Sequence, residues 1–274
     1  MFFDQVSDRR RKQALKIAVC VKSVPDTETK ISIAADKKNI DLNGVRFITS
    51  PFDEFAIEEA IKLKEKNGGE TVAISVGGKE VTDVLRDSLA RGIDSAVHVD
   101  DPDLTWLDPL STAKVLAAAI KDGGYDVVLC GQQGVGGDNS QVPSILAELL
   151  NIPQVTLVLK LEIDGNKFKA EREIEGAKEI VEGTLPAVFS AQKGLNEPRY
   201  PSIKGVMAAR RKEIAVKNAE ALGIKGTVGG DNRKVVIKEM TLPPDRGQGR
   251  RLEGDVDAQV KTLVELLRKE AHVI

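Results

Sequence analysis

The hydrophobic positions in the first half of the chain follow two alternating patterns. One pattern is a short run in which almost every residue is apolar, and it recurs at residues 16–21, 71–76, 95–99 and 126–130. Runs of this length that are apolar on both faces are typical of central strands in a parallel sheet covered on both sides. The sequence therefore predicts four buried parallel strands in this half.

The second pattern places apolar residues at helical spacing between these runs. It predicts helices over about 51–67, 79–91, 109–121 and 139–150. Ser50 fits the N-cap of the first helix, Pro51 its first position and Asp53 its first turn. Strands that alternate with helices in this way predict right-handed βαβ units, and hence an α/β fold with a doubly wound, mostly parallel sheet.

The pattern becomes strand-like over residues 154–190. Asp164-Gly165-Asn166 has the composition of a hairpin turn, which predicts an antiparallel strand on either side of it. A further strand is expected over 181–190, with Pro186 near an edge or a bend. These residues would add a β-hairpin region to the sheet.

The C-terminal residues have a different character. The segment 223–255 is rich in Gly, Pro and charge without periodicity, and 256–270 has an apolar stripe at helical spacing. A stripe at the end of an extended arm needs a partner surface on which to be buried. We expect a polar tail at 1–15, an α/β domain at 16–205, and an extended C-terminal arm with a helix at 206–274.

Composition mainly excludes classes of function. Lys and Arg total 40 against 42 Asp and Glu, a net charge of -2, so we expect no nucleic-acid partner. Two His and two Cys are too few for a metal cage or a disulfide framework, and no metal site is expected. No apolar run approaches the roughly 20 residues of a membrane span. The charged N-terminal residues lack the apolar core of a signal peptide, so we expect a cytoplasmic protein.

Candidate chemistry follows the predicted strands. In open α/β sheets, ligands bind beyond the carboxyl ends of the strands, at the switch point of the topology. Segments 22–27, 49–53 and 131–141 fall there, and the third, which we call the glycine loop, is the most informative. Its four glycines let the backbone approach a ligand and present N–H groups to anionic oxygens. Asp138, Asn139 or Ser140 is expected to cap the helix that follows.

The glycine loop matches neither the dinucleotide fingerprint nor the P-loop motif. No nucleophile constellation accompanies it, because Cys20 and Cys130 end apolar strands and His98 lies within one. The residues therefore favour either a binding module or a subunit that holds a redox cofactor, in which the cofactor supplies the chemistry and the protein contributes no catalytic side chain. An adenine-nucleotide-binding regulator of the universal-stress type is the alternative from another class.

Several spaced motifs, taken together, resemble the electron transfer flavoprotein β subunit family. They are Val21–Asp26, Ser50–Glu54 with Ala56–Ala60, the glycine loop, Glu171–Gly176 with Leu185–Val188, Asn196–Tyr200 and Met207–Lys212. The resemblance covers about residues 16–217 in one order. It departs from the family at Gly136, which stands where a first acid is expected, and at Val142-Pro143, where Gly or Thr is common.

The resemblance implies a heterodimer with an electron transfer flavoprotein α subunit, which carries an FAD and receives the C-terminal arm. The β domain would bind an adenine nucleotide: AMP in plain electron carriers, or a second FAD that accepts a hydride from NADH in electron-bifurcating members. Val24-Pro25-Asp26-Thr27 resembles the bifurcating group, so we expect FAD, with AMP as the alternative. Implied partners are dehydrogenases such as acyl-CoA dehydrogenase, NADH, and a quinone-reducing, ferredoxin or flavodoxin acceptor.

Carried over by position, the resemblance also implies individual contacts. Backbone amides of the glycine loop would meet phosphate, Asp138 and Gln141 would fix the sugar or phosphate end, and Val24-Pro25-Asp26 would lie near the flavin ring. Leu195 would dock on partner dehydrogenases. The implied nucleotide contacts are Cys20, Val24, Pro25, Asp26, Ser50, Pro51, Phe52, Asp53, Val76, Gly131, Gln132, Gln133, Gly134, Val135, Gly136, Gly137, Asp138, Asn139, Ser140, Gln141 and Val142.

Overall fold

The computed structural model describes residues 14–104, 107–244, 247 and 249–274. Nearly all of the expected tail at 1–15 lies outside the described residues. The chain divides into two compact units. The first runs up to Ile31 and from Asp41 to Lys238, and the second combines Ser32–Ile40 with Glu239–Ile274.

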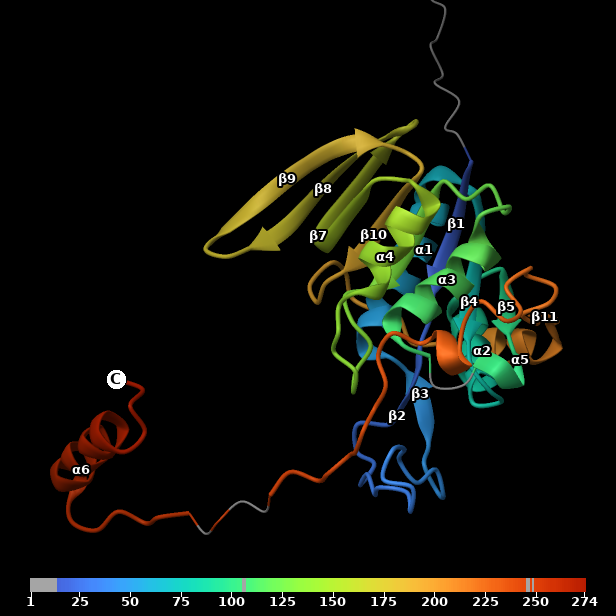
Figure 1. Cartoon of the computed structure of the whole chain (residues 1–274). Helices are drawn as coiled ribbons and strands as arrows, with labels where there is room; N and C mark the ends of the chain where they lie inside the picture. Colours follow the sequence, from blue (N-terminus) through green and yellow to red (C-terminus); the bar gives the residue numbers. More distant parts are fainter. Residues whose placement is uncertain (1–13, 105–106, 245–246, 248) are drawn as a thin grey trace, which may run out of the picture. The chain divides into compact units, whose positions relative to one another are not determined.

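The first unit is built on one sheet, which in the described part of the chain has nine strands in the order β11-β5-β4-β1-β6-β10-β7-β8-β9 (Figure 1). All neighbours from β11 to β7 pair in parallel, and β8 and β9 continue the sheet antiparallel. This confirms the predicted α/β fold with a mostly parallel sheet and an added hairpin. The strands are β1 (Leu15–Cys20), β4 (Gly69–Val76), β5 (Ser95–Val99), β6 (Val127–Gly131), β7 (Gln154–Asp164), β8 (Lys167–Ile174), β9 (Ala177–Thr184), β10 (Ala187–Ala191) and β11 (Ile214–Lys217).

Helices cover both faces of the sheet. Residues of β1 alternate between them: Ile17 and Val19 pack in a core with α1 and α2, whereas Ala18 and Cys20 pack in a second core with α3 and α4. This explains why the strand is apolar at every position from Ile17 to Cys20. The helices are α1 (Pro51–Asn67), α2 (Val81–Arg91), α3 (Pro109–Ile120), α4 (Val142–Leu150) and α5 (Ile203–Arg211), with short 3-10 turns at η1 (Pro102–Leu104) and η2 (Gly230–Asn232).

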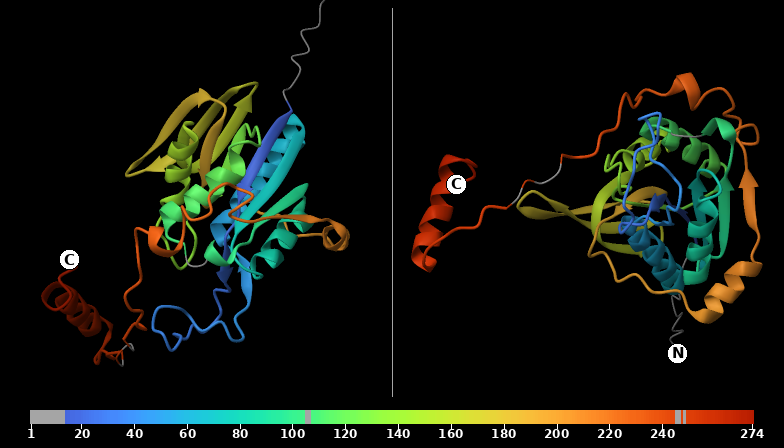
Figure 2. Two further views of the ribbon diagram at one scale, coloured as in Figure 1. Left: turned by 45° about the vertical axis from the view of Figure 1, so that its right-hand side comes forward. Right: turned by 90° about the horizontal axis from the view of Figure 1, so that it is seen from below.

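The order of the strands sets the position of the site. From β1 the chain continues to β4 and β5 on one side, and then crosses to β6 on the other side of β1. The switch point of this doubly wound sheet therefore lies between the carboxyl ends of β1 and β6. An antiparallel ribbon of β2 (Ser23–Pro25) and β3 (Phe47–Thr49) follows β1 at this edge. The right-hand panel of Figure 2 looks onto this end of the sheet from below.

The predicted single strand over 181–190 is wrong. The structure has two strands there, β9 and β10, separated by the cis peptide bond between Leu185 and Pro186. Most of β9 is exposed, whereas every residue of β10 is buried between β6 and β7. An apolar pattern that continues across Pro186 hid the change from a surface strand to a central one.

The first unit extends well beyond residue 205. The strand β11 pairs in parallel with β5, and Ala219, Leu222 and Val228 are buried beside Val99. The expected boundary at 205 therefore falls inside this unit. The basic residues around α5 obscured the strand, because an edge strand of four residues buries too little to show a clear pattern.

The second unit contains α6 (Val256–Lys269), which begins at Asp255, whose side chain accepts a hydrogen bond from the Ala258 N–H. No residue of α6 is buried, and its apolar stripe, Val256, Val260, Leu263 and Val264, is exposed. None of the helices in the described residues is both long enough and apolar enough to cross a membrane.

Candidate functional site

The predicted site residues gather at one edge of the sheet. Cys20 ends β1, Val76 ends β4 and Gly131 ends β6. These three strands are parallel neighbours, so their carboxyl ends lie side by side. The first turn of α1, which starts at Pro51, is held against the same edge by its Asp53 side chain. The role of these residues as nucleotide contacts stays a prediction.

Asp53 bridges the switch point. Its carboxylate accepts the Lys22 N–H at 2.7 Å through one oxygen and the Gly131 N–H at 2.9 Å through the other. The residue is only 5% exposed. The contact requires glycine at 131, since a Cβ there would lie 2.3 Å from Oδ1 of Asp53 and 2.8 Å from its backbone nitrogen.

Burial raises the pKa of the Asp53 carboxyl to about 7, and the N–H groups of Lys22 and Gly131 act in the opposite direction. The neighbouring Lys22 ammonium also lowers this pKa, but less than burial raises it. Asp53 is therefore held by backbone donors and titrates near neutral pH. Such a carboxylate fixes the positions of the two loops that it joins.

The Lys22 side chain lies against the glycine loop. A Cβ at Gly134 would be 2.4 Å from Cδ of Lys22 and 2.8 Å from its Nζ. Loss of solvation lowers the pKa of the ammonium, while the carboxylates of Asp53 and Asp138 raise it. The side chain keeps contact with solvent, so its charge is accessible to an anion at the loop.

The second half of the glycine loop is organised by its own side chains. Nε2 of Gln133 donates to Oδ1 of Asp138 at 3.0 Å, and Oγ of Ser140 donates to Oε1 of Gln133 at 2.9 Å. Both Asp138 and Ser140 have positive φ, which favours a tight turn. Residues 136–141 are exposed. Hydrogen bonds among its own side chains thus fix the conformation of the loop, and its outer surface stays exposed to solvent.

The predicted start of the following helix at residue 139 is wrong, because α4 begins at Val142. Neither Asp138, Asn139 nor Ser140 caps it, and Gln141 precedes it without a side-chain cap bond. The reason is Pro143. Proline is tolerated in the first turn of a helix, whereas a start at 139 would have placed it where its missing N–H is needed.

Two buried polar atoms at this edge have no hydrogen-bond partner among the described residues: Oγ of Ser50 and Oε1 of Gln132. Ser50 is the N-cap of α1, as predicted, but its side chain makes no cap bond, and its backbone carbonyl accepts the Asp53 N–H. An unpaired buried polar atom costs about 1–3 kcal/mol. With the glycine backbone and the Lys22 ammonium, these atoms fit the phosphate and hydroxyl groups of a nucleotide.

The Val24-Pro25-Asp26 segment extends this edge along the β2–β3 ribbon. Val24 is 1% exposed, so its side chain is committed to the core. Pro25 and Asp26 are half-buried. The Asp26 N–H donates to the Arg46 carbonyl at 2.8 Å, which holds the segment on the ribbon. Only Pro25 and Asp26 present side-chain surface here.

The two cysteines are neighbours at the floor of the site. Each follows the last residue pair of β1 and β6, Val19 opposite Leu129, both pack in the same core, and both are buried free thiols. A hydrogen bond with Cys20 raises the pKa of the Cys130 thiol, and burial raises it further by a smaller amount. A thiol with a raised pKa is a poor nucleophile at neutral pH. The contacts agree with the expectation that neither cysteine is a nucleophile.

Leu195 lies in loop 192–202 between β10 and α5, which leaves the sheet at the same carboxyl edge, since Ala191 pairs with Gly131. It is half-buried and packs against the core formed by α1 and α2. The sequence placed Lys22 in the candidate segment 22–27 and Arg199 in the Asn196–Tyr200 motif, but assigned neither side chain a role of its own. Lys22 directly follows a buried strand at the switch point, and this position was a usable signal.

Comparisons with known proteins agree with the motifs. A family model described as the electron transfer flavoprotein domain matches residues 39–222. The chain is 42% identical over 261 residues to the electron transfer flavoprotein subunit beta of Bacillus subtilis, covering 95% of this chain and 100% of the relative. The subunit of the same name from Thermoanaerobacterium thermosaccharolyticum is 39% identical over 262 residues, with the same coverage. That of Mus musculus is 36% identical over 250 residues, covering 90% of this chain and 96% of the relative.

Proposed function

Because the chain belongs to the electron transfer flavoprotein family, among its β subunits, we propose that it binds a nucleotide cofactor at the carboxyl edge of its sheet and that this cofactor is FAD. An α subunit carrying its own FAD completes the heterodimer. The complex passes electrons between dehydrogenases or NADH and a quinone-reducing, ferredoxin or flavodoxin acceptor, by flavin-based bifurcation. Acyl-CoA dehydrogenase is the dehydrogenase partner to test first.

The observation that carries this proposal is the arrangement around Asp53. One buried carboxylate holds the ends of β1 and β6, and the Lys22 ammonium lies against Gly134 of the glycine loop. Oγ of Ser50 and Oε1 of Gln132 are buried there without protein partners among the described residues. An anionic ligand with hydroxyl groups satisfies both features.

Each part of the site has a separate task. Lys22 and the N–H groups of the glycine loop bind phosphate. Ser50 and Gln132 orient the nucleotide through hydrogen bonds. Pro25 and Asp26 border the flavin ring. The bound FAD supplies the chemistry, which is hydride acceptance from NADH followed by single-electron transfer. The Val24-Pro25-Asp26 segment supports FAD over AMP through its resemblance to the bifurcating group.

The second unit contributes assembly. The exposed apolar stripe of α6 packs on the α subunit, since a helix with this stripe is stable in water only when the stripe is covered. The arm adds no chemistry in this proposal. It fixes the distance between the two subunits and therefore between their cofactors.

The test is the cofactor content of the heterodimer, co-expressed with an α subunit and purified without denaturation. We expect two FAD per heterodimer and bleaching of flavin absorbance when NADH is added. One FAD with one AMP, and no reaction with NADH, would overturn bifurcation and leave a plain electron carrier. A stable colourless homodimer would overturn the electron-transfer function itself.

A lysine variant assigns the second nucleotide to the β site. Lys22→Met should weaken the β-site nucleotide by about tenfold or more, as expected for the loss of a charged partner of phosphate. The α-site FAD should remain bound. Lys121→Met, an exposed lysine that follows α3, is the matched control and should leave both cofactors in place.

A further inference from the structure

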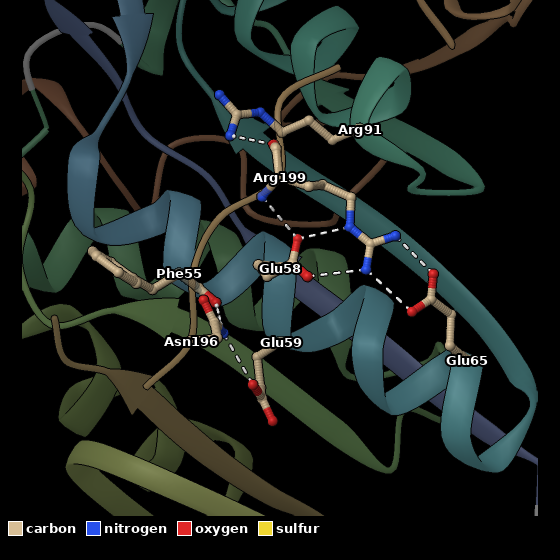
Figure 3. A network of polar contacts seen from close by, with 7 residues as sticks. All are labelled: Phe55, Glu58, Glu59, Glu65, Arg91, Asn196 and Arg199. Atoms are coloured by element: carbon tan, nitrogen blue, oxygen red, sulfur yellow. Dashed lines mark hydrogen bonds and ion pairs between the residues drawn. The ribbon is translucent and has the colours of Figure 1, made fainter. Parts of the chain in front are cut away.

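Loop 192–202 has little regular structure of its own near Leu195. The Gln192 N–H donates to the Val158 carbonyl at 3.1 Å, and the Leu195 N–H donates to the Gln192 carbonyl at 3.2 Å. Beyond Leu195, side chains make the contacts that fix the loop. Figure 3 shows these side chains, which reach from the loop onto α1.

Arg199 makes the largest set of these contacts. Its Nε and Nη2 donate to the two oxygens of Glu58 at 2.8 and 2.9 Å, and its Nη1 and Nη2 donate to those of Glu65 at 2.7 and 3.1 Å. Its backbone N–H also donates to Glu58, at 3.1 Å. Glu58 and Glu65 are two helical turns apart on α1, and one guanidinium therefore joins both.

The loop has two further attachments. Nδ2 of Asn196 donates to the Phe55 carbonyl at 3.0 Å and to Oε2 of Glu59 at 2.9 Å. Nη1 of Arg91, on α2, donates to the Arg199 carbonyl at 3.2 Å. The loop is thus fixed on the N-terminal side of Leu195 by the hydrogen bond of Gln192, and on its C-terminal side by the contacts of Asn196 and Arg199.

The two ion pairs of Arg199 differ in burial. The Glu58 side chain is 7% exposed and that of Glu65 is 56% exposed. Both carboxylates raise the pKa of the guanidinium, and Arg199 lowers the pKa of Glu65. The Arg199 guanidinium and the Glu65 carboxylate are therefore both charged at neutral pH. The three side chains border an open groove of about 650 Å³, which is lined by Glu58, Lys62, Glu65, Gly194, Asn196, Glu197 and Arg199.

We propose that Arg199 is a positioning residue for partner docking: it holds loop 192–202 on α1 so that Leu195 is presented in one fixed conformation. This rests on the proposed function and on the docking of Leu195 on partner dehydrogenases that the family resemblance implies. A loop ordered before binding leaves less conformational entropy to be lost on association. Arg199 thus acts through the position of Leu195 and leaves the cofactor site unchanged.

The experiment measures electron transfer from acyl-CoA dehydrogenase to the purified heterodimer, with the heterodimer as the varied substrate. Arg199→Gln should raise the KM for the heterodimer by about tenfold, the size expected when two or three side chains must be ordered on docking. The kcat and the content of both cofactors should stay within about twofold. A lowered kcat with unchanged KM would overturn the proposal.

A double-mutant cycle separates positioning from direct contact with the partner. Glu65→Gln alone should raise KM by a smaller factor, and Arg199→Gln with Glu65→Gln should be no worse than Arg199→Gln alone. Additive effects would mean that Arg199 contacts the partner itself, and would overturn the proposal. Lys62→Gln is the matched control, because it lines the same groove without a bond to the loop, and it should leave KM unchanged.

Leu195→Ala distinguishes failure of this proposal from failure of the docking function. If Leu195→Ala raises KM and both Arg199→Gln and Glu65→Gln do not, the positioning role is wrong and docking stands. If Leu195→Ala has no effect, the docking function itself is wrong. Should Arg199→Gln fail to fold, Glu65→Gln and Arg199→Lys decide, since Glu65 is exposed and lysine keeps the charge without the two-pronged geometry.

Discussion

Acidic side chains attach loops to helix α1 at two places, and the kind of hydrogen-bond donor differs between them. In its first turn, Asp53 holds the ends of β1 and β6 through backbone N–H groups, and burial raises its pKa to about 7. Further along, Glu58 and Glu65 hold loop 192–202 through the guanidinium of Arg199, which lowers the pKa of Glu65. Backbone donors hold Asp53, whose charged form burial disfavours, whereas a guanidinium pairs directly with Glu58 and Glu65.

The difference follows from what each contact leaves available. A cation bonded directly to Asp53 would occupy the space that we propose for the phosphate of the nucleotide, whereas N–H donors hold the carboxylate from within the backbone. At loop 192–202 an ion pair has no such drawback, because a protein partner needs a fixed surface. We infer that the two ends of α1 can be altered separately, one affecting the cofactor and the other docking.

Gly131→Ala should break the Asp53 end with the largest effect. The added Cβ would lie 2.3 Å from Oδ1 of Asp53 and 2.8 Å from the backbone of α1, which cannot move aside cheaply. We expect a loss of about 3 kcal/mol of unfolding free energy and of the β-site nucleotide, since overpacking typically costs 1–3 kcal/mol and here meets backbone. Thermal melting and nucleotide content measure both.

Gly136→Ala is the control for this prediction. It lies in the same glycine loop, and a Cβ there has no neighbour within 4 Å, so only its φ of 88° opposes the change. A loss of about 1 kcal/mol is expected. Equal losses in the two variants would show that loop flexibility, rather than the close approach to Asp53, determines stability.

Asp53→Asn should have the next largest effect. The amide can accept only one of the two N–H bonds and turns an NH₂ group toward the other donor. An unpaired buried donor costs about 1–3 kcal/mol, so nucleotide affinity at the β site should fall about tenfold or more. Asp83→Asn, an exposed acid in the first turn of α2, is the matched control. Unchanged affinity in Asp53→Asn would contradict the bridging role.

The pH dependence of stability tests the charge state of Asp53. Its pKa is raised from 3.8 to about 7 in the folded protein, so the folded state holds this proton more tightly than the unfolded state. Stability should therefore fall as pH rises from about 4 to 7 and level off above 7. Between pH 5 and 7 the change in this contribution is about 2 kcal/mol. Urea unfolding at a series of pH values should show this fall in stability for the wild type and not for Asp53→Asn. Parallel plots of stability against pH for the two proteins would contradict the prediction.

Much of this comparison could be predicted from local patterns. The continuous apolar runs located β1, β4 and β6, and parallel pairing then required their ends to meet at one edge. The glycine loop was found because its composition differs from that of the strand before it. These features depend on residues that are near one another in the sequence.

The rest depends on contacts between distant residues. Asp53 was noted as a first-turn acid, but its bond to Gly131 joins positions 78 residues apart, and Arg199 meets Glu58 across 141. No spacing rule reports such pairs. The start of α4 was misplaced for a different reason, because three capping candidates at 138–140 outweighed the stronger constraint of Pro143.

The smallest predicted effect concerns the stability contributed by Glu65. Its ion pair with Arg199 is exposed, so Glu65→Gln should change the unfolding free energy by at most about 0.5–1 kcal/mol. Glu58→Gln should cost more, about 2 kcal/mol, because it weakens a buried charge-assisted pair with the same guanidinium. Thermal melting of the two heterodimers measures the difference. Equal losses would mean that burial does not distinguish the Arg199–Glu58 ion pair from the Arg199–Glu65 ion pair, and that α1 holds loop 192–202 through charge alone.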